Sequence, residues 1–429
     1  MLKSIKNLWL LKDLRKKILI TTFILLIVRS IDQIPLPGIN TSELAAFFSS
    51  NQILGLLDVF SGGALSSFSI GFMGVGPYIT ASIIMQLLGY VIPALEELQK
   101  EGEYGKQKYN QYTRLLTVPL CFIQGFGMIS ILKNQGVLSE ITPMLFIDSL
   151  IVVTAISMFF MWLGENISEI GIGNGISLII SINIIGGLPA QIRNTIATVS
   201  AGGIIDTSKI IGLISFVAIS ILTIIFIVIM NEAIRKIPIS YARRIVGRLQ
   251  TTPIDTYLPV KINVAGVIPI IFALSIIVFP SIIFKYLSSA KSTLISNFSR
   301  EMVRLFDPNH IFYGIFYFIL VILFTYFYAS IVFKPSQVAE NLQKSGGFIP
   351  GVRPGKETQN FISNVLNRIT LPGALFLGII AILPFIIQKI THISTLVLGG
   401  TSILILVSVI LDTSSQIKSH LLTRSYENY

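Results

Sequence analysis

An apolar segment long enough to cross a membrane runs from 60 to 88, but Gly71, Gly74, Gly76 and Pro77 interrupt it near its middle. Proline has no backbone N–H and clashes with the preceding helical turn, and glycine lowers helix stability. We therefore expect two half-helices, the second beginning at Pro77, because proline is favoured in the first helical turn. Backbone groups freed by such a break cannot face lipid, so the break should face protein or a water-filled cavity. In membrane proteins such a cavity is commonly the functional site.

The composition is that of a membrane protein, because 52% of the 429 residues are apolar and only 12% are charged. A spanning helix needs about 20 apolar residues. Ten segments qualify: 18–36, 76–92, 115–133, 145–163, 175–191, 210–230, 264–284, 311–333, 370–388 and 395–411. The basic head before the first span leads to no small-residue cleavage site, so we expect this span to be retained. The predicted fold class is an all-α membrane protein with ten transmembrane helices.

Basic residues indicate the orientation. If the N-terminus is inside, the inner segments hold 23 of the 32 Lys and Arg residues, so both termini are predicted to be cytoplasmic. Two inner loops, 231–263 and 334–368, are long and basic. Loops of this length commonly have a function such as docking a partner, although solvated charges that only set the topology are the alternative.

Ten spans divide evenly at a polar connector, residues 195–208. The predicted domains are an N-terminal half (1–194) and a C-terminal half (209–429), joined by this external hinge connector. Because each half has an odd number of spans, two similar halves would be inverted relative to each other, with a pore or site at their interface. The sequences of the halves show no convincing repeat, so this symmetry is a hypothesis.

The chemistry of enzymes and proton-coupled carriers is missing from the spans. Arg29, Asp32 and Asp148 lie at span ends, the three histidines are dispersed, and the lone Cys121 lies within a span, where we expect it to pack. Residues 351–358 resemble a phosphate-binding loop, but the spacing is one residue short and the lysine precedes Glu. We expect no catalysis, metal or cofactor. A passive pore driven from inside by another protein fits this pattern.

Eight motifs, in order and spread over nearly the whole chain, resemble the SecY family, the central subunits of the bacterial protein-conducting channel. They are PLPGI (35–39), FSGGALS (60–66), PYITASIIMQLL (77–88), KEGEYGKQKYNQYTR (100–114), MWLGENISEIGIGNGISLII (161–180), LPVKINVAGVIPIIFA (258–273), GGFIPGVRPGKET (346–358) and LGGTSILILV (398–407). The resemblance implies two five-helix halves around a pore. It also implies passive translocation of unfolded secretory polypeptides, and lateral release of membrane-protein helices into the lipid of the cytoplasmic membrane.

The resemblance places a short plug helix before the second span, closing the channel from outside. Its residues here are Ala64, Leu65, Ser66, Ser67, Phe68, Ser69, Ile70, Gly71 and Phe72, with Ser61, Gly62 and Gly63 as cap and hinge. Leu65, Phe68 and Phe72 recur at helical spacing, which independently predicts one apolar face. An ordinary re-entrant helix that does not move is the alternative.

The resemblance also implies a hydrophobic pore ring that stops ions by dewetting. Its residues here are Val75, Ile79, Ile176, Ile180, Ile271 and Ile405. Without the motifs, each would be interpreted as a core or lipid-facing residue, because isoleucine is abundant in every span. The amides Gln86, Gln124 and Asn263 fall on helices that the resemblance assigns to a lateral gate for signal sequences. Static interhelical hydrogen bonds are the alternative.

The two basic loops match the family's docking platforms for the SecA motor ATPase and the translating ribosome. Our docking candidates are Arg243, Arg244, Arg248, Arg353 and Lys356. Contacts with ribosomal RNA would be made to phosphate and would weaken with salt. The resemblance further implies the small membrane subunits SecE and SecG as partners. Two other functional classes stay open: a secondary transporter that uses the broken helices as a substrate site, and a structural membrane scaffold.

Overall fold

The computed structural model describes residues 11–36, 44, 61–134, 142–200, 207–241, 256–288, 293–307, 310–391 and 400–427. Its helices are α2 (Lys12–Ile31), α5 (Gly76–Val91), α6 (Pro93–Lys100), α7 (Glu103–Asn134), α8 (Pro143–Ile170), α9 (Gly175–Ser200), α10 (Thr207–Glu232), α11 (Ile268–Leu287), α12 (Thr293–Leu305), α13 (Ile311–Val332), α14 (Pro335–Lys344), α15 (Lys356–Thr391) and α16 (Gly400–Glu427). Each of the ten predicted spans falls on one of these helices. The predicted connector 195–208 is partly helical, and its residues 201–206 lie outside the described residues.

Length and composition alone mark six helices of the described residues as able to cross a membrane, or seven if the bent pair α5 and α6 forms one span. Two further segments, Gly175–Pro189 and Ile268–Ile277, are shorter apolar helices. The bend between α5 and α6 is 103° and occurs before Pro93, whose ring cannot continue the preceding helix. The chain is a multi-pass membrane protein.

Several helices extend well beyond the lipid-spanning segments. α7 begins at Glu103 and α15 at Lys356, in segments that the sequence analysis treated as inner loops. Polar residues with good helix propensity continue a helix into water as readily as apolar ones, so hydropathy alone gives the span but not the helix end. The Arg114 guanidinium of α7 pairs with Glu165 of α8, with Nη2 and Oε2 2.8 Å apart.

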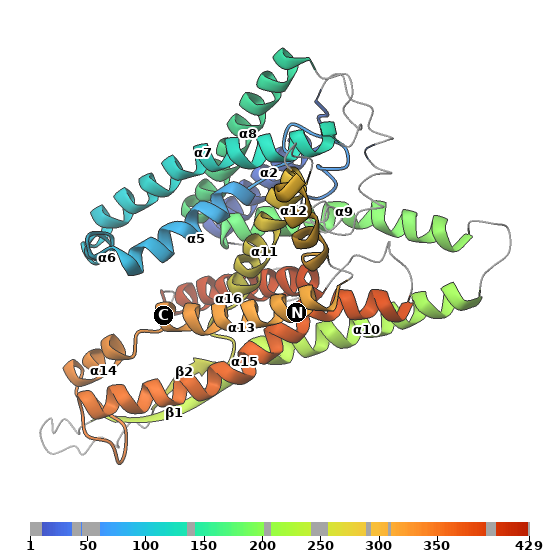
Figure 1. Cartoon of the computed structure of the whole chain (residues 1–429). Coiled ribbons are helices and arrows are strands. Elements are labelled where there is room, and N and C mark those ends of the chain that lie inside the picture. The colour runs from blue at the N-terminus through green and yellow to red at the C-terminus, as the bar shows by residue number, and fades with distance from the viewer. Residues whose placement is uncertain are drawn as a thin grey trace, which may run out of the picture.

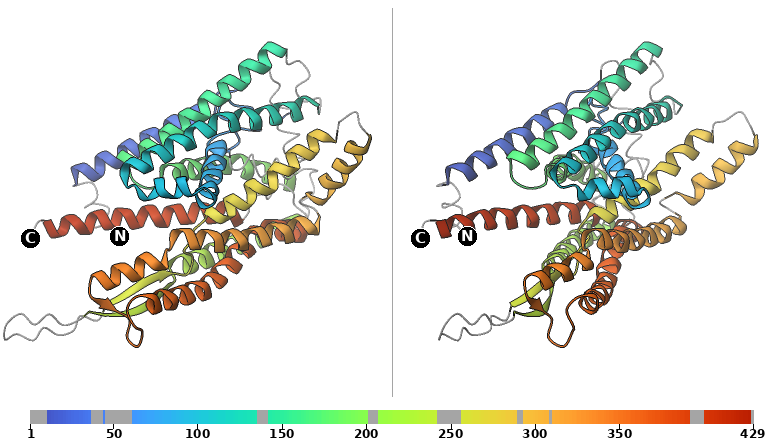
Figure 2. Two further views of the ribbon diagram at one scale, coloured as in Figure 1. Left: turned by 60° about the vertical axis from the view of Figure 1, so that its left-hand side comes forward. Right: turned by 90° about the vertical axis from the view of Figure 1, so that its left-hand side faces the viewer.

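The helices form two groups (Figures 1 and 2). The helices α2, α5, α7 and α8, coloured from blue to blue-green, lie on one side, and α10, α13 and α15 lie on the other. α9 belongs with the first group, and α11 and α16 belong with the second. Contacts of α11 with α5 and α7, and of α16 with α9, connect the two groups. The interior between the groups is therefore lined by helices from both ends of the chain.

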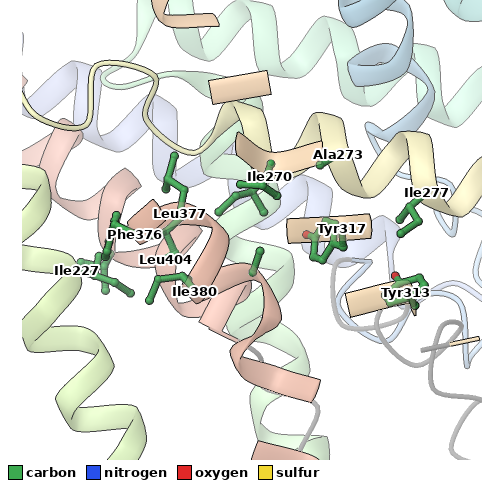
Figure 3. Close-up of a cluster of buried hydrophobic side chains, with 13 residues drawn as sticks. Ile227, Ile270, Ala273, Ile277, Tyr313, Tyr317, Phe376, Leu377, Ile380 and Leu404 are labelled. Atoms are coloured by element: carbon green, nitrogen blue, oxygen red, sulfur yellow. The ribbon is translucent and has the colours of Figure 1, made fainter. Parts of the chain in front are cut away.

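The C-terminal group is held by one large apolar cluster (Figure 3). It contains Ile227 of α10, Ile270 of α11, Tyr313 and Tyr317 of α13, and Leu377 of α15, all at most 1% exposed. Because buried side chains of all five helices belong to this cluster, their packing fixes α10, α11, α13, α15 and α16 relative to one another.

A small sheet corrects the purely α-helical expectation. Strands β1 (Ile234–Tyr241), β2 (Thr256–Lys261) and β3 (Gly347–Phe348) pair antiparallel in the order β2-β1-β3. Alternate residues of β1, Ile237 and Ile239, are buried and pack with side chains of α14 and α15. The two basic segments expected as loops thus join in one folded unit. Sequence analysis missed the sheet because β1 and β2 each contain a proline, which argues against a strand, and because β3 has only two residues.

Candidate functional site

Residues 61–75 form a series of tight turns that leads into α5 at Gly76. The expectation of a short helix over Ala64–Phe72 was therefore wrong. Phe68 has a φ of +45°, which a right-handed helix cannot contain. The hydroxyls of Ser66 and Ser67 donate to the Gly63 carbonyl. Such local bonds compete with the helical pattern. The predicted break before α5 is confirmed, with Pro77 in the first turn.

The apolar face predicted for this segment is present despite the different backbone. Leu65, Phe68 and Phe72 are buried and pack with Met128, Ile129, Leu132, Leu150 and Val153 of α7 and α8. The Ser61 hydroxyl accepts a hydrogen bond from the Leu65 N–H, 3.1 Å away, as expected of a capping residue. The segment is thus seated on the N-terminal group of helices.

A short antiparallel pairing ties the same segment to the chain that follows α2. The Leu36 N–H donates to the Phe68 carbonyl, 3.0 Å away, and the Ile70 N–H donates to the Ile34 carbonyl, 2.9 Å away. Pro35 and Ser69 are partners in this bridge. The sequence gave no indication of this tether, because a one-residue bridge needs no repeated pattern.

The predicted ring residues lie in one apolar cluster. Val75, Ile180 and Ile405 are buried in it, and Ile79, Ile176 and Ile271 pack against it. They come from α5, α9, α11, α16 and the residue that precedes α5. Side chains from both halves of the sequence are therefore brought together at one point.

A cavity of about 210 Å³ opens beside this cluster. Five of the six ring residues line it: Val75, Ile79, Ile180, Ile271 and Ile405. Ile176 does not, and its side chain lies against Gly164 instead. Leu65 and Phe72 of the segment 64–72 close part of the same cavity. Sequence analysis missed the lining residue Asn183, although an amide in the middle of a largely apolar span could have drawn attention to it.

The three predicted gate amides do not bond to one another in the described part of the chain. Gln124 of α7 donates to the Thr80 hydroxyl of α5, with 3.4 Å between nitrogen and oxygen. The Asn263 amide donates to the Asn231 side chain of α10, 2.8 Å away. Gln124 and Thr80 line the cavity, as do Leu274 and Ser275 of α11.

Two predicted docking residues are described, and both are exposed. Arg353 belongs to the turn between β3 and α15, where Gly351 and Gly355 have positive φ values, and Lys356 is the first residue of α15. The Thr358 hydroxyl donates to the Arg353 carbonyl, 2.8 Å away, which fixes the turn. Arg243, Arg244 and Arg248 lie outside the described residues.

Apolar side chains from both halves of the chain meet beside one cavity, and residues of the segment before α5 line part of it, an arrangement of the class found in membrane channels. The family model described as SecY matches residues 69–414. The protein translocase subunit SecY of Mycobacterium bovis is 40% identical over 436 residues, covering 97% of each chain. That of Halalkalibacterium halodurans is 41% identical and covers all of both chains. The chain belongs to the SecY family.

Solved structures share the fold. A protein-conducting channel matches with a TM-score of 0.63 and 19% identity, over 94% of this chain and 91% of that one. A SecY protein whose plug domain stabilises the closed translocation channel and maintains a membrane seal gives 0.60 at the same identity and coverage. Sec61 in a canine ribosome-channel complex gives 0.58, also at this identity and coverage. The predicted ten-helix, two-half fold is confirmed, as is the function as central subunit of a protein translocation channel. The family is not a catalytic one.

Proposed function

We propose that the cavity beside Val75, Ile79, Ile180, Ile271 and Ile405 is the constriction through which unfolded polypeptides leave the cytoplasm. The observation that carries this proposal is that side chains from five helices (α5, α7, α9, α11 and α16) and from the segment 64–72 line one cavity. An apolar collar of this kind excludes ions by dewetting, yet it yields to an extended chain because no strong bond must be broken. Ile176 supports the collar from outside the cavity.

The segment 64–72 acts as the movable seal. Its closed position is supported by the burial of Leu65, Phe68 and Phe72. Gly62 and Gly63, with φ values of +69° and +87°, serve as its hinge. Opening requires the segment to leave its seat on α7 and α8, while Pro77 and the rest of α5 remain in place.

Membrane-protein helices leave sideways between α7 and α11. Residues of both helices line the cavity, so a chain inside it lies next to this seam. Gln124 of α7 lines the cavity beside this seam and donates to Thr80 of α5 rather than to α11, so this bond need not break when the seam opens. Gln86 and Asn263 belong to the same gate. The Asn263 amide, bonded to Asn231 of α10, keeps its position when the gate opens. The halves 1–194 and 209–429 open about the connector 195–208.

Energy comes from a cytosolic partner that docks on the sheet and turn described above. Exposed Arg353 and Lys356 lie in and directly after the fixed turn, and Arg243, Arg244 and Arg248 follow β1 in the sequence. The partners are the SecA motor and the ribosome, with SecE and SecG as small membrane subunits. Both termini lie on the cytoplasmic side of the cytoplasmic membrane, where the basic inner segments place them.

Reconstituted vesicles test the proposal. The chain, copurified with its small subunits, should make a secretory preprotein resistant to added protease in the presence of motor and ATP. A variant with Ile180→Lys and Ile405→Lys should lose most of this protection, because two buried charges disrupt the collar. Lys418→Ile, at an exposed position near the end of α16, serves as the control and should keep full protection. Equal protection by the collar variant and the control would overturn the proposal.

A further inference from the structure

The C-terminal end of α2 carries two charged residues next to the segment 61–75. The Arg29 guanidinium donates from Nη1 to the Gly62 carbonyl, 3.0 Å away, and from Nη2 to the Gly186 carbonyl of α9, 2.9 Å away. It therefore fastens the beginning of the segment to α9. Bonds from a charged donor are about twice as strong as neutral ones.

The position of Arg29 depends on two glycines. A Cβ at Gly186 would overlap the guanidinium carbon of Arg29. A Cβ at Gly62 would lie 3.0 Å from Nη1 of Arg29 and 2.5 Å from the Asn183 carbonyl oxygen. The space for the guanidinium exists because neither position has a side chain.

Asp32 lies one turn beyond Arg29. Arg29 strengthens the contact with the segment 61–75, whereas Asp32 weakens it. It is 1% exposed, and neither carboxylate oxygen has a hydrogen-bond partner among the described residues. A Cβ at Gly71 would overlap its Oδ1, so Asp32 lies directly against the end of the segment 64–72. The Asn183 side chain and the Arg29 charge lie close to the carboxylate and partly compensate its burial, but neither of its oxygens has a hydrogen bond of good geometry in the described part of the chain. An unsatisfied buried carboxylate destabilises the packing that buries it.

We propose that Arg29 and Asp32 act on the seal in opposite directions. Arg29 fixes the hinge at Gly62 in its closed conformation, and so opposes the backbone rotation that opening requires. Asp32 weakens the closed position at Gly71, so that the segment can leave without a large input of energy. Both are positioning residues, and the inference rests on the proposed function of the segment 64–72 as a seal.

Accessibility of the seal measures this balance without any transport. Met73 is partly buried and lines the cavity, and the only cysteine, Cys121, is buried. A chain with Cys121→Ala and Met73→Cys, in its complex with the small subunits in right-side-out vesicles, reports opening as the rate of labelling by a membrane-impermeant maleimide. Arg29→Gln should raise this rate at least about tenfold, because two charge-assisted bonds are lost. Arg29→Lys, which keeps the charge, should restore part of the protection.

Three further variants test the roles of Arg29 and Asp32 separately and provide a control. Gly186→Ala displaces the Arg29 guanidinium without removing it, and it should raise the labelling rate as Arg29→Gln does. It therefore still tests the inference if Arg29→Gln fails to assemble. Asp32→Asn, a neutral residue of the same shape, should lower the rate about threefold or more. Arg193→Ala, at an exposed position of α9, should leave the rate unchanged.

Unchanged labelling in Arg29→Gln and Gly186→Ala, or faster labelling in Asp32→Asn, would overturn the inference. Deletion of residues 64–72 in the same vesicles separates this result from a failure of the proposed function. If the deletion raises ion leakage while Arg29→Gln leaves labelling unchanged, the seal stands and only the role of Arg29 is lost. If the deletion leaves leakage unchanged, the segment is not the seal, and the inference falls with it.

Discussion

The rings of Phe68 and Phe72 stack with their centroids 5.0 Å apart and their planes 16° from parallel. Both side chains are at most 2% exposed and belong to the cluster that includes Ile129 and Leu132 of α7. Stacked aromatic pairs contribute about 0.5–1.5 kcal/mol beyond the burial of their surface. This pair anchors the segment 64–72, which lines part of the cavity, although the backbone between the two residues is not helical.

Replacement of Phe72 by alanine should therefore loosen the seal. Truncation of a buried phenylalanine costs about 3–5 kcal/mol in soluble cores, and here the loss falls on the closed position only. We expect a marked rise in ion leakage through the resting channel, measured as conductance in planar bilayers. Phe23→Ala, at a 65% exposed position of α2, is the control and should leave conductance unchanged. A silent Phe72→Ala would contradict the anchoring role.

The collar should hold back ions even without the seal. In a chain lacking residues 64–72, Ile180→Asn or Ile405→Asn should raise ion conductance further, because a polar side chain in the constriction favours wetting. Ile410→Asn changes the same helix at a 56% exposed position and serves as the matched control. If all three variants conduct alike, these isoleucines do not form the barrier.

The ion pair between Arg114 and Glu165 should stabilise the contact of α7 with α8. Its two bonds, 3.0 and 2.8 Å long, join a partly exposed arginine to a carboxylate that is 17% exposed. Glu165→Gln should lower the free energy of unfolding by about 1–2 kcal/mol, which thermal denaturation of the purified complex would detect. Lys100→Gln breaks the exposed pair with Glu96 and should cost no more than about 0.5 kcal/mol. Similar shifts in both variants would show that the Arg114 pair is no stronger than a surface one.

Arg353→Glu should weaken docking of the cytosolic partner. The side chain is exposed on a fixed turn, so reversal of its charge changes the interface without disturbing the fold. We expect at least about a tenfold loss of affinity for motor or ribosome in sedimentation assays, and a smaller difference from the parent chain at high salt. Arg304→Glu, at an exposed position of α12, is the control. Equal affinities of the two variants would remove Arg353 from the docking surface.

Sequence patterns predicted the features that depend on residues close together in the chain. The break before Pro77 and the ten spans could be predicted because proline chemistry and apolar length act locally. The proximity of Ile79 to Ile405 came from the family resemblance, since nothing local distinguishes these isoleucines from those that face lipid.

Other features depend on contacts between distant segments and could not be predicted. The helical spacing of Leu65, Phe68 and Phe72 correctly indicated a buried face but wrongly indicated a helix, because serine hydroxyls and the positive φ of Phe68 give turns instead. The attachment of Arg29 to Gly186 joins residues 157 positions apart. Only the folded chain brings them together.

The central claim is that a translocating polypeptide passes the ring formed by Val75, Ile79, Ile180, Ile271 and Ile405. The most direct measurement places a photo-crosslinking residue at Ile79 or Ile405, with a secretory chain stalled during translocation. The account predicts crosslinks from both positions to the stalled chain, and none from the exposed position Ile410. If the stalled chain never labels Ile79 or Ile405 but labels Ile410, polypeptides do not pass through this ring.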